Sequence, residues 1–348
     1  MTKMLAARYL GPGRIEAGHI ATPQIEEEEA LIAVEACGFC GSDINIVAGT
    51  HPRAKAPLTL GHELAGRIVR IRTSQSNFAV GDLVTIYPLI SCGHCHACTH
   101  GNSHVCKALR LFGFDLDGGM AQFVKVPLSA LLKLPANMTA RVGALIEPLA
   151  VAVHGVARAR LQGVEVIAVL GAGPIGLLTA LVVQAHGIPH VVISDVLPSR
   201  IELAKSLGLH AVRAGEPLRR TMMELSGQNG ADLIFECAGQ PSSAREMTLL
   251  ARPRGVIVNL AVFKWPVEID MQAINFKEIE VIGSRVYQRK DFEDAIEFAS
   301  RLPIDRIVSH AFSLQDVSIA FEAFRSGEVC KALILPPAQE LQNVYEPV

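Results

Sequence analysis

Residues 166–176 read Val166-Ile-Ala-Val-Leu170-Gly171-Ala-Gly173-Pro174-Ile175-Gly176, and this stretch decides the fold. Its five apolar residues predict a buried strand, and the G-x-G-x-x-G spacing predicts a tight turn into a helix. The first glycine permits the turn, the second lets backbone approach a pyrophosphate, and the third lets helix and strand pack closely. The pattern therefore predicts a dinucleotide site formed by Gly171, Gly173, Pro174, Ile175 and Gly176.

Asp195 ends the next predicted strand, about 20 residues after the turn. A carboxylate at this position accepts hydrogen bonds from ribose hydroxyls and repels a 2′-phosphate, which favours NAD over NADP. Arg200 lies close enough in sequence to weaken that preference slightly. The alternative is a glycine-rich turn that holds no cofactor, with Asp195 capping the following helix.

Strands and helices alternate on both sides of this turn. The predicted strands are Glu165–Leu170, His190–Ser194, Ala231–Glu236 and Arg254–Leu260, and the predicted helices are Pro174–His186, Ser199–Leu207 and Pro241–Ala251. Such alternation predicts a parallel, doubly wound sheet, here ending near Gly283. Because ligands bind outside the carboxyl ends of such strands, we expect Glu236–Gly239 and Val262 to lie near the nicotinamide.

The first 140 or so residues have a different character. They are rich in glycine and proline and contain short β-type runs at Ala30–Ala36, Gly66–Ile71, Asp82–Tyr87 and Gln122–Val126. This pattern predicts an irregular all-β domain, followed by a helical run at residues 148–160. Beyond the sheet, helices are predicted at Asp291–Arg301 and Leu314–Arg325 and a last strand at Val329–Leu335. A chain of 348 residues exceeds one core, so two domains are expected.

Composition excludes several classes of partner. The net charge is −2, with 19% charged and 50% hydrophobic residues, so nothing in the charge balance favours nucleic acid or anionic lipid. The N-terminus lacks the apolar segment of a signal peptide. Residues 166–183 are uncharged and as long as a short membrane span, but their central Gly/Pro cluster predicts a turn. We therefore expect a cytoplasmic protein without a membrane partner.

Four of the eight cysteines form one cluster with the spacing C-x2-C-x2-C-x7-C, namely Cys92, Cys95, Cys98 and Cys106. In a long chain without a secretory signal, such spacing favours metal over disulfides. Four thiolates fill the tetrahedral shell of zinc, so this ion would stabilise a loop and do no chemistry. An iron–sulfur cluster and a nucleic-acid-binding zinc ribbon are the alternatives. The nearby histidines are expected to be surface polar residues: His94, His96, His100 and His104.

A second group of metal-ligating residue types is spread along the chain. Cys40, His62, Glu63 and Glu147 offer the thiolate, imidazole and carboxylate that a catalytic zinc with one exchangeable position needs. Each residue also has an ordinary interpretation. Cys40 is half of a C-x-x-C pair with Cys37, although no helix is predicted after it to lower a thiol pKa. Buried filler, a core histidine and a helix-starting acid explain the individual residues equally well.

Five motifs occur in a fixed order: Gly38-Phe-Cys40-Gly-Ser42-Asp43, Gly61-His62-Glu63, the cysteine cluster, Glu147-Pro-Leu-Ala150 and Gly171–Gly176. Together they resemble the zinc-dependent medium-chain dehydrogenase/reductase family, in its polyol (sorbitol-type) and threonine dehydrogenase branch. The resemblance covers essentially the whole chain. It implies an α/β protein with a GroES-like β-rich catalytic domain at 1–148, completed by 287–348. It also implies a doubly wound Rossmann NAD-binding domain at 149–286.

The resemblance implies roles for the second metal group. Cys40, His62 and Glu63 would bind a catalytic zinc, and Glu147 would either bind it directly or hold the zinc-bound water. Ser42 resembles the hydroxyl that passes on the alcohol proton. The roles of Cys40, Ser42, His62, Glu63 and Glu147 are therefore expected to be catalytic.

Two further positions concern the same site. Asp43 resembles the acid that orients the histidine ligand. Many members of the branch carry a histidine five residues after the zinc cysteine, whereas this chain has Asn45, which does not titrate near neutrality. Any proton relay must then run through Ser42, water, a ribose hydroxyl or His51. We expect His51 to be an ordinary loop histidine.

These observations predict an enzyme with two Zn²⁺ ions per chain, one catalytic and one structural, and NAD as cofactor. The resemblance implies that it transfers a hydride from a secondary alcohol of a polyol or sugar-derived substrate to NAD. One alternative is L-threonine 3-dehydrogenase, for which Arg285 is a candidate anion contact. Another is a regulatory protein that binds zinc and NAD without turnover. The expected partners are a small alcohol and other copies of the chain, with a homotetramer favoured over a dimer.

Overall fold

The protein was analysed as a computed structural model, which describes residues 2–73, 75–327 and 329–337. The chain divides into two compact units. Unit 1 comprises residues 1–147 and 308–348, and unit 2 comprises residues 148–307. None of the helices in the described ranges has both the length and the hydropathy that crossing a bilayer requires.

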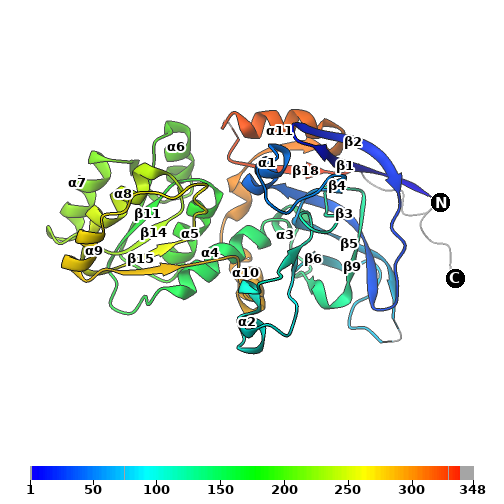
Figure 1. Ribbon diagram of the computed structural model, residues 1–348, viewed down its shortest axis with the longest axis horizontal. Coiled ribbons are helices and arrows are strands. Elements are labelled where there is room, and N and C mark those ends of the chain that lie inside the picture. The colour runs from blue at the N-terminus through cyan, green and yellow to red at the C-terminus, as the bar shows by residue number, and fades with distance from the viewer. Residues whose placement is uncertain (1, 74, 328, 338–348) are drawn as a thin grey trace. The chain divides into compact units, whose positions relative to one another are not determined.

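Unit 2 is built around a six-stranded parallel sheet with the order β13-β12-β11-β14-β15-β16. Figure 1 labels its strands β11, β14 and β15. The strands are β11 (Val166–Leu170), β12 (His190–Asp195), β13 (His210–Arg213), β14 (Ala231–Glu236), β15 (Ala251–Asn259) and β16 (Glu280–Gly283). The helices are α4 (Ile146–Arg158), α5 (Pro174–Ala185), α6 (Pro198–Ser206), α7 (Glu216–Leu225), α8 (Pro241–Leu250), α9 (Met271–Lys277) and α10 (Arg289–Ala299). The strand order reverses direction between β11 and β14, as in a doubly wound sheet. The predicted fold class of this half is confirmed.

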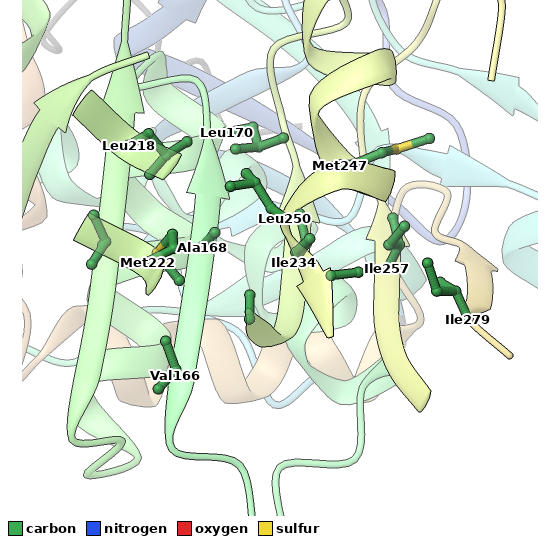
Figure 2. Packing of buried hydrophobic residues seen from close by; sticks show 13 residues of the cluster. Val166, Ala168, Leu170, Leu218, Met222, Ile234, Met247, Leu250, Ile257 and Ile279 are labelled. Carbon is green, nitrogen blue, oxygen red and sulfur yellow. The ribbon is translucent and has the colours of Figure 1, made fainter. Parts of the chain in front are cut away.

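The core of unit 2 follows from the apolar strand that opened the sequence analysis. Val166, Ala168 and Leu170 alternate along β11, so their side chains share one face of the sheet. Figure 2 shows this face with the neighbouring Ile234 and Ile257 and the helix residues that cover it. The covering residues are Leu218 and Met222 from α7 and Met247 and Leu250 from α8. Burial of this surface on both sides explains why β11 reads as an unbroken apolar run.

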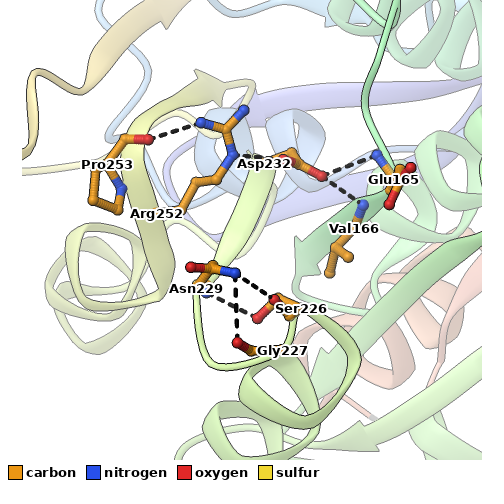
Figure 3. Close-up of polar contacts among 9 residues, drawn as sticks. Glu165, Val166, Ser226, Gly227, Asn229, Asp232, Arg252 and Pro253 are labelled. Atoms are coloured by element: carbon orange, nitrogen blue, oxygen red, sulfur yellow. Dashed lines mark hydrogen bonds and ion pairs between the residues drawn. The ribbon is translucent and has the colours of Figure 1, made fainter.

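The amino-terminal ends of three strands are tied together by one aspartate (Figure 3). Asp232 accepts hydrogen bonds from the amides of Glu165 and Val166 at 2.9 and 2.8 Å. Its other oxygen pairs with Arg252 Nε at 2.5 Å. A polar cavity of about 540 Å³ lies beside this pair, also lined by Ser226 and Asn229. It lies at the end of β11 away from the glycine turn, so it is no part of the predicted dinucleotide site.

Unit 1 contains a seven-stranded sheet with the order β10-β6-β5-β3-β18-β17, to which β9 adds by pairing with β3, and a three-stranded sheet β2-β1-β4. The strands are β1 (Lys3–Gly11), β2 (Arg14–Ala21), β3 (Glu29–Phe39), β4 (Leu58–Thr59), β5 (Glu63–Arg72), β6 (Leu83–Ile86), β7 (Leu89–Ile90), β8 (Arg110–Leu111), β9 (Phe123–Pro127), β10 (Leu131–Lys133), β17 (Val308–Ser313) and β18 (Lys331–Leu335). The helices are α1 (Gly41–Val47), α2 (His96–Thr99), α3 (Ala140–Gly143) and α11 (Val317–Arg325). The C-terminal strand β18 pairs with β3, so the end of the chain completes the β-rich unit.

The second crossing between the units differs from the expectation. The sequence placed the return to the β-rich unit at residue 287, whereas the structure places it at Val308. The reason is that α10 packs within unit 2, where Asp291 forms a buried 2.7 Å hydrogen bond with His154 of α4. Tyr287 and Phe292 pack against each other nearby. Helical periodicity identified α10 correctly but carries no information about the surface on which the helix packs.

The missed elements include the nine-residue β1 and the eight-residue β2 of unit 1 as well as shorter elements. The strand β13 has four residues and α9 has seven, and neither was predicted. The helix α7 was also missed, because its Glu-Pro start and its two arginines obscure the apolar face formed by Leu218 and Met222. Short runs of this kind depend on tertiary packing more than on local propensity.

Candidate active site

The register of one antiparallel strand pair brings the second metal group together. Gly38 of β3 lies opposite Glu63 of β5, so Cys40 follows the end of one strand and His62 precedes the start of the other. Ligand atoms of Cys40, His62 and Glu63 all lie within 4.8 Å of one another. A side chain at Gly38 would place its Cβ 1.9 Å from Glu63 Oε2, so only glycine leaves room for this carboxylate. The structure thus assembles three of the four predicted ligands.

A helix does follow Cys40, contrary to the expectation. Cys40 is the N-cap residue of α1, and the Asp43 carboxylate accepts a 2.9 Å hydrogen bond from the Cys40 amide. The Gly-Ser-Asp sequence after Cys40 is a capping signal, because a short acid three residues after the cap satisfies a free amide. No disulfide joins Cys37 and Cys40, which are both free thiols. Cys37 is fully buried, and this burial raises the pKa of its thiol well above the usual value.

The site is a buried concentration of negative charge. Burial disfavours the charged form of His62, but the hydrogen bond and charge of Cys40, followed by Glu147 and Asp43, outweigh it and raise the pKa of His62 to about 10. Burial raises the pKa of Asp43 to about 6. Asp43 Oδ1 and His62 Nδ1 are both buried and make no hydrogen bond among the described residues. A thiolate, an imidazole and carboxylates gathered in this way form the donor set that suits Zn²⁺.

Glu147, the fourth predicted ligand, lies close but outside the 4.8 Å group. It sits in the first turn of α4 and is buried, with 6% of its surface exposed. Its charge acts on both His62 and Lys331, which places it beside the site. This position suits either of the two roles expected for it.

Lys331 is the site residue that the sequence analysis missed. Its ammonium group forms a fully buried ion pair with the Glu63 carboxylate and donates a 3.2 Å hydrogen bond to the Phe39 carbonyl. Burial opposes its charge, but Glu63 and Cys40 outweigh that effect and raise the pKa of Lys331. The pairing of β18 with β3 places it there, with Ala332 opposite Phe39. A lysine at the start of an apolar strand, Lys331–Leu335, was the available signal.

Ser42, Asn45 and His51 also take defined positions. Ser42 Oγ lies 3.5 Å from Cys40 Sγ, beside the ligand group. The carbonyl of Asn45 accepts a 3.1 Å hydrogen bond from the His51 amide, so the loop after α1 folds back on that helix. The His51 ring packs on Phe114, and Phe114 packs edge-on against His62, both at 4.9 Å between centroids. His51 was expected to be an ordinary loop histidine, but only the ring of Phe114 separates it from His62.

The four-cysteine cluster forms a second, separate metal-ligand group. The Sγ atoms of Cys92, Cys95, Cys98 and Cys106 lie within 4.8 Å of one another. Pairwise separations of 3.5, 3.8 and 4.0 Å are close to the ~3.8 Å edge of a tetrahedron with 2.3 Å Zn–S bonds. The backbone amides of Cys98 and Lys107 lower the pKa of Cys95 to about 6, which favours the thiolate.

The neighbouring histidines are not part of that ligand group. His94, His96 and His100 are exposed, as expected for surface polar residues. His104 is buried, with 7% of its surface exposed, so the expectation was wrong for this residue. It lies in a short 3-10 turn, residues 103–105, that packs against α2.

The glycine turn of unit 2 has the geometry that its spacing predicted. Gly171 has φ +96°, and a Cβ there would lie 2.9 Å from the backbone of Ala238. A Cβ at Gly176 would lie 1.8 Å from the Gly171 carbonyl oxygen, so this glycine permits the close packing of turn and helix. Gly173 is the N-cap residue of α5, whose first residues are Pro174 and Ile175. A Cβ added at Gly173 would have no other atom within 4 Å. The N-terminus of α5 has no side-chain cap and is open beside Gly173, which leaves room for an anion there.

The predicted cofactor contacts gather at the same edge of the sheet. Asp195 Oδ2 accepts a 2.8 Å hydrogen bond from the amide of Ala172, inside the turn, and Oδ1 accepts one from Leu197. Glu236 accepts bonds from the amides of Ala238 and Gly239 at the end of β14. Val262 is 88% exposed. A Cβ added at Gly239 would lie 3.6 Å from the Val262 carbonyl oxygen, so the two residues are neighbours. Arg200 lies in the first turn of α6, and Arg285 is exposed after β16.

Comparisons with known proteins agree with this geometry. Residues 26–136 match the alcohol dehydrogenase GroES-like domain, and residues 174–301 match the zinc-binding dehydrogenase domain. A 2-dehydro-3-deoxy-L-galactonate 5-dehydrogenase from Pseudoalteromonas atlantica is 36% identical, covering 91% of this chain and 94% of the relative. The chain belongs to the zinc-type medium-chain alcohol dehydrogenase family. The β-rich unit 1 is thus the GroES-like domain and the parallel sheet of unit 2 the Rossmann domain of this family.

Other members of the family match over a similar extent. A sorbitol dehydrogenase from Halalkalibacterium halodurans is 33% identical over 96% of this chain and 99% of the relative. A solved structure of a protein assigned as a zinc-binding dehydrogenase from Sinorhizobium meliloti, bound to NADP, superposes with a TM-score of 0.90. It is 31% identical, covering 97% of this chain and 100% of that one. As a member of this family, the chain is a zinc-dependent oxidoreductase of alcohols that uses a nicotinamide dinucleotide.

Proposed function

We propose that this enzyme oxidises a secondary hydroxyl of a polyol or sugar-derived substrate to the ketone, with NAD as hydride acceptor. The observation that carries the proposal is the Cys40–His62–Glu63 group, in which His62 and Glu63 are buried and Cys40 is half-buried, in a chain similar to relatives named for sorbitol and a sugar acid. We propose that these three residues hold the catalytic zinc, with Glu147 binding it directly or through water. The cluster of Cys92, Cys95, Cys98 and Cys106 would hold a second, structural zinc.

The mechanism follows from the positions of the side chains. When bound, zinc supplies a Lewis acid for the substrate hydroxyl and NAD supplies a hydride acceptor. Ser42 lies beside Cys40, so its hydroxyl is placed to accept the proton that the alcohol loses. Lys331 holds Glu63 in place and offsets part of the negative charge that Cys40 and Glu147 add. Asp43 fixes Cys40 at the start of α1.

A substrate screen tests this proposal directly. The purified enzyme is incubated with NAD and polyols, sugar acids or L-threonine, and NADH formation is followed. Turnover of a polyol or sugar acid is the expected result. Exclusive turnover of L-threonine would identify the amino-alcohol alternative instead. Binding of zinc and NAD without reduction by any substrate would contradict the enzyme proposal and favour a regulatory protein.

We also propose a preference for NAD over NADP, which rests on Asp195. Replacing Asp195 by Asn removes the negative charge that would repel a 2′-phosphate. We expect the ratio of kcat/KM for NAD to that for NADP to fall at least about tenfold. The measurement is initial rates with both cofactors at a fixed substrate concentration. The exposed Glu202 of α6 provides the control, because E202Q should leave the ratio unchanged. An unchanged ratio in D195N would assign Asp195 only the structural role of holding Ala172.

We propose a homo-oligomer, with a tetramer favoured over a dimer. Support comes from large apolar side chains exposed along α9 and the segment before it, Trp265, Met271 and Phe276. The next strand along the chain, β16, is an edge strand of the sheet and carries the exposed Val281. Exposed apolar surface beside an edge strand marks an association site.

Replacing Trp265 by Glu should disrupt this association. The new charge would be buried without a partner in the interface, so we expect the molar mass to fall to the 37.3 kDa of one chain. Light scattering coupled to size exclusion measures this, with the exposed Ile319 of unit 1 as control (I319E). A wild-type mass of 37.3 kDa would refute the oligomer.

We place the protein in the cytoplasm, since all eight cysteines are free thiols.

A further inference from the structure

We infer that His51 is a specificity-determining residue that hydrogen-bonds a second polar group of the substrate, one beyond the hydroxyl that is oxidised. This inference rests on the proposed function, because it concerns the same site. The imidazole packs against Phe114 at a tilt of 54°, and the Phe114 ring packs edge-on against the metal-ligand candidate His62. Two ring contacts therefore connect His51 to the ligand group, a separation that a sugar-sized molecule can span.

The orientation of the imidazole is set by the backbone. His51 Nδ1 accepts hydrogen bonds from the amides of Ala54 and Arg53 at 3.2 and 3.4 Å. A nitrogen that accepts from amides carries no proton, so the neutral ring has its proton on Nε2. Partial burial, together with the neighbouring Arg53, lowers the pKa of His51 and supports the neutral form, although Asp115 acts in the opposite direction. His51 thus presents one N–H donor with no protein partner among the described residues.

The wall that carries His51 is held together by an arginine. Arg53 pairs with Asp115 at 3.2 Å and donates a hydrogen bond to the Leu109 carbonyl, which joins the loop of residues 51–54 to the segment 109–115. That segment crosses directly over the turn before His62. A Cβ at Gly113 would lie 2.8 Å from the backbone of Gly61, so the two segments touch. The positions of Phe114 and His51 relative to His62 are therefore fixed by packing.

The chemical class of the ligand group follows from the donor. A single neutral N–H beside an aromatic ring suits a hydroxyl or carboxylate oxygen, carried here by an alcohol with a second polar group near the reacting carbon. A site built to bond such a group discriminates strongly against analogues that lack it, because the donor is then left unpaired. A simple secondary alcohol offers no such oxygen. His51 would consequently contribute to the use of polyols and sugar acids and contribute nothing to that of simple alcohols.

The test combines variants with a pair of substrates. Initial rates are measured for wild type, H51L and H51Q with the best polyol or sugar acid and with its analogue lacking the second oxygen. We expect H51L to lower kcat/KM for the full substrate at least about tenfold while changing that for the analogue less than about twofold. H51Q keeps an N–H donor and should restore part of the loss. The exposed His19 of β2 is the matched control, and H19Q should change neither substrate.

Equal losses on both substrates would assign His51 a structural role and overturn this inference alone. No loss in H51L on either substrate would overturn it as well. Absence of any wild-type turnover would refute the proposed function and, with it, this inference. Zinc content measured on each variant separates loss of the metal from loss of the substrate contact.

Discussion

Replacing Cys40 by Ser is expected to lower the rate of alcohol-dependent NAD reduction by at least about 10³-fold. The thiolate is the softest donor in the Cys40–His62–Glu63 group, and a neutral hydroxyl at this position is a poor zinc ligand. Loss of the Lewis acid removes several kcal/mol of transition-state stabilisation, and each 1.4 kcal/mol corresponds to a factor of ten. Zinc content should fall from two ions per chain to one, because the four-cysteine cluster is separate.

Binding of NAD to C40S should be unchanged, since the glycine turn and Asp195 lie in unit 2. Fluorescence titration with NADH and metal analysis of the purified variant measure the two effects. Cys330 provides a matched control, as a buried thiol of unit 1 outside both metal-ligand groups, and C330S should retain activity within about threefold. If C40S kept wild-type turnover, the assignment of the catalytic zinc to this group would be wrong.

Replacing Lys331 by Met is expected to destabilise unit 1 by about 3–5 kcal/mol in the zinc-depleted protein. The substitution leaves the fully buried Glu63 carboxylate without its cation, and an uncompensated buried charge has a cost of this size. The effect should be smaller in the zinc-loaded protein, because the metal offsets the charge of Glu63. Urea unfolding before and after chelation measures both values.

Two further variants make the Lys331 experiment specific. K331M combined with E63Q should recover part of the stability, because the second change removes the unpaired charge. K125M removes the half-exposed partner of Glu29 in the same unit and should cost less than about 1 kcal/mol. A loss in K331M no larger than that in K125M would show that the buried pair adds nothing to stability. Equal losses with and without zinc would contradict the proposal that Glu63 binds the metal.

The central strands of the Rossmann unit and its dinucleotide turn could be predicted from the sequence, because their signals are local. An apolar run, three glycines and Asp195 lie within about 30 residues, and their periodicity determines strand, turn and helix. The cysteine cluster could also be predicted from the sequence, because two-residue spacers bring its first three cysteines close together. The failures within this unit were short elements such as β13, whose formation depends on packing against β12.

The second metal group, Cys40, His62, Glu63 and Glu147, could be predicted from the sequence only in part. Residue types at positions 40, 62, 63 and 147 suggested a metal, but only the resemblance to a family selected that interpretation over ordinary core residues. The structure supplies the missing physical link, which is the pairing of Gly38 with Glu63 across β3 and β5. It also corrects the expectation that no helix follows Cys40, because α1 begins there.

The sequence by itself determined the family, the doubly wound sheet, the dinucleotide turn and the cysteine cluster, because each motif on which these depend consists of residues that are near neighbours along the chain. The tertiary structure decided the partner of Glu63, the place of His51 and the return to unit 1 at Val308. Lys331 lies 268 positions from Glu63 in the sequence, and the two meet through the register of β18 on β3. Such contacts follow from how strands align and helices pack, which local periodicity does not specify.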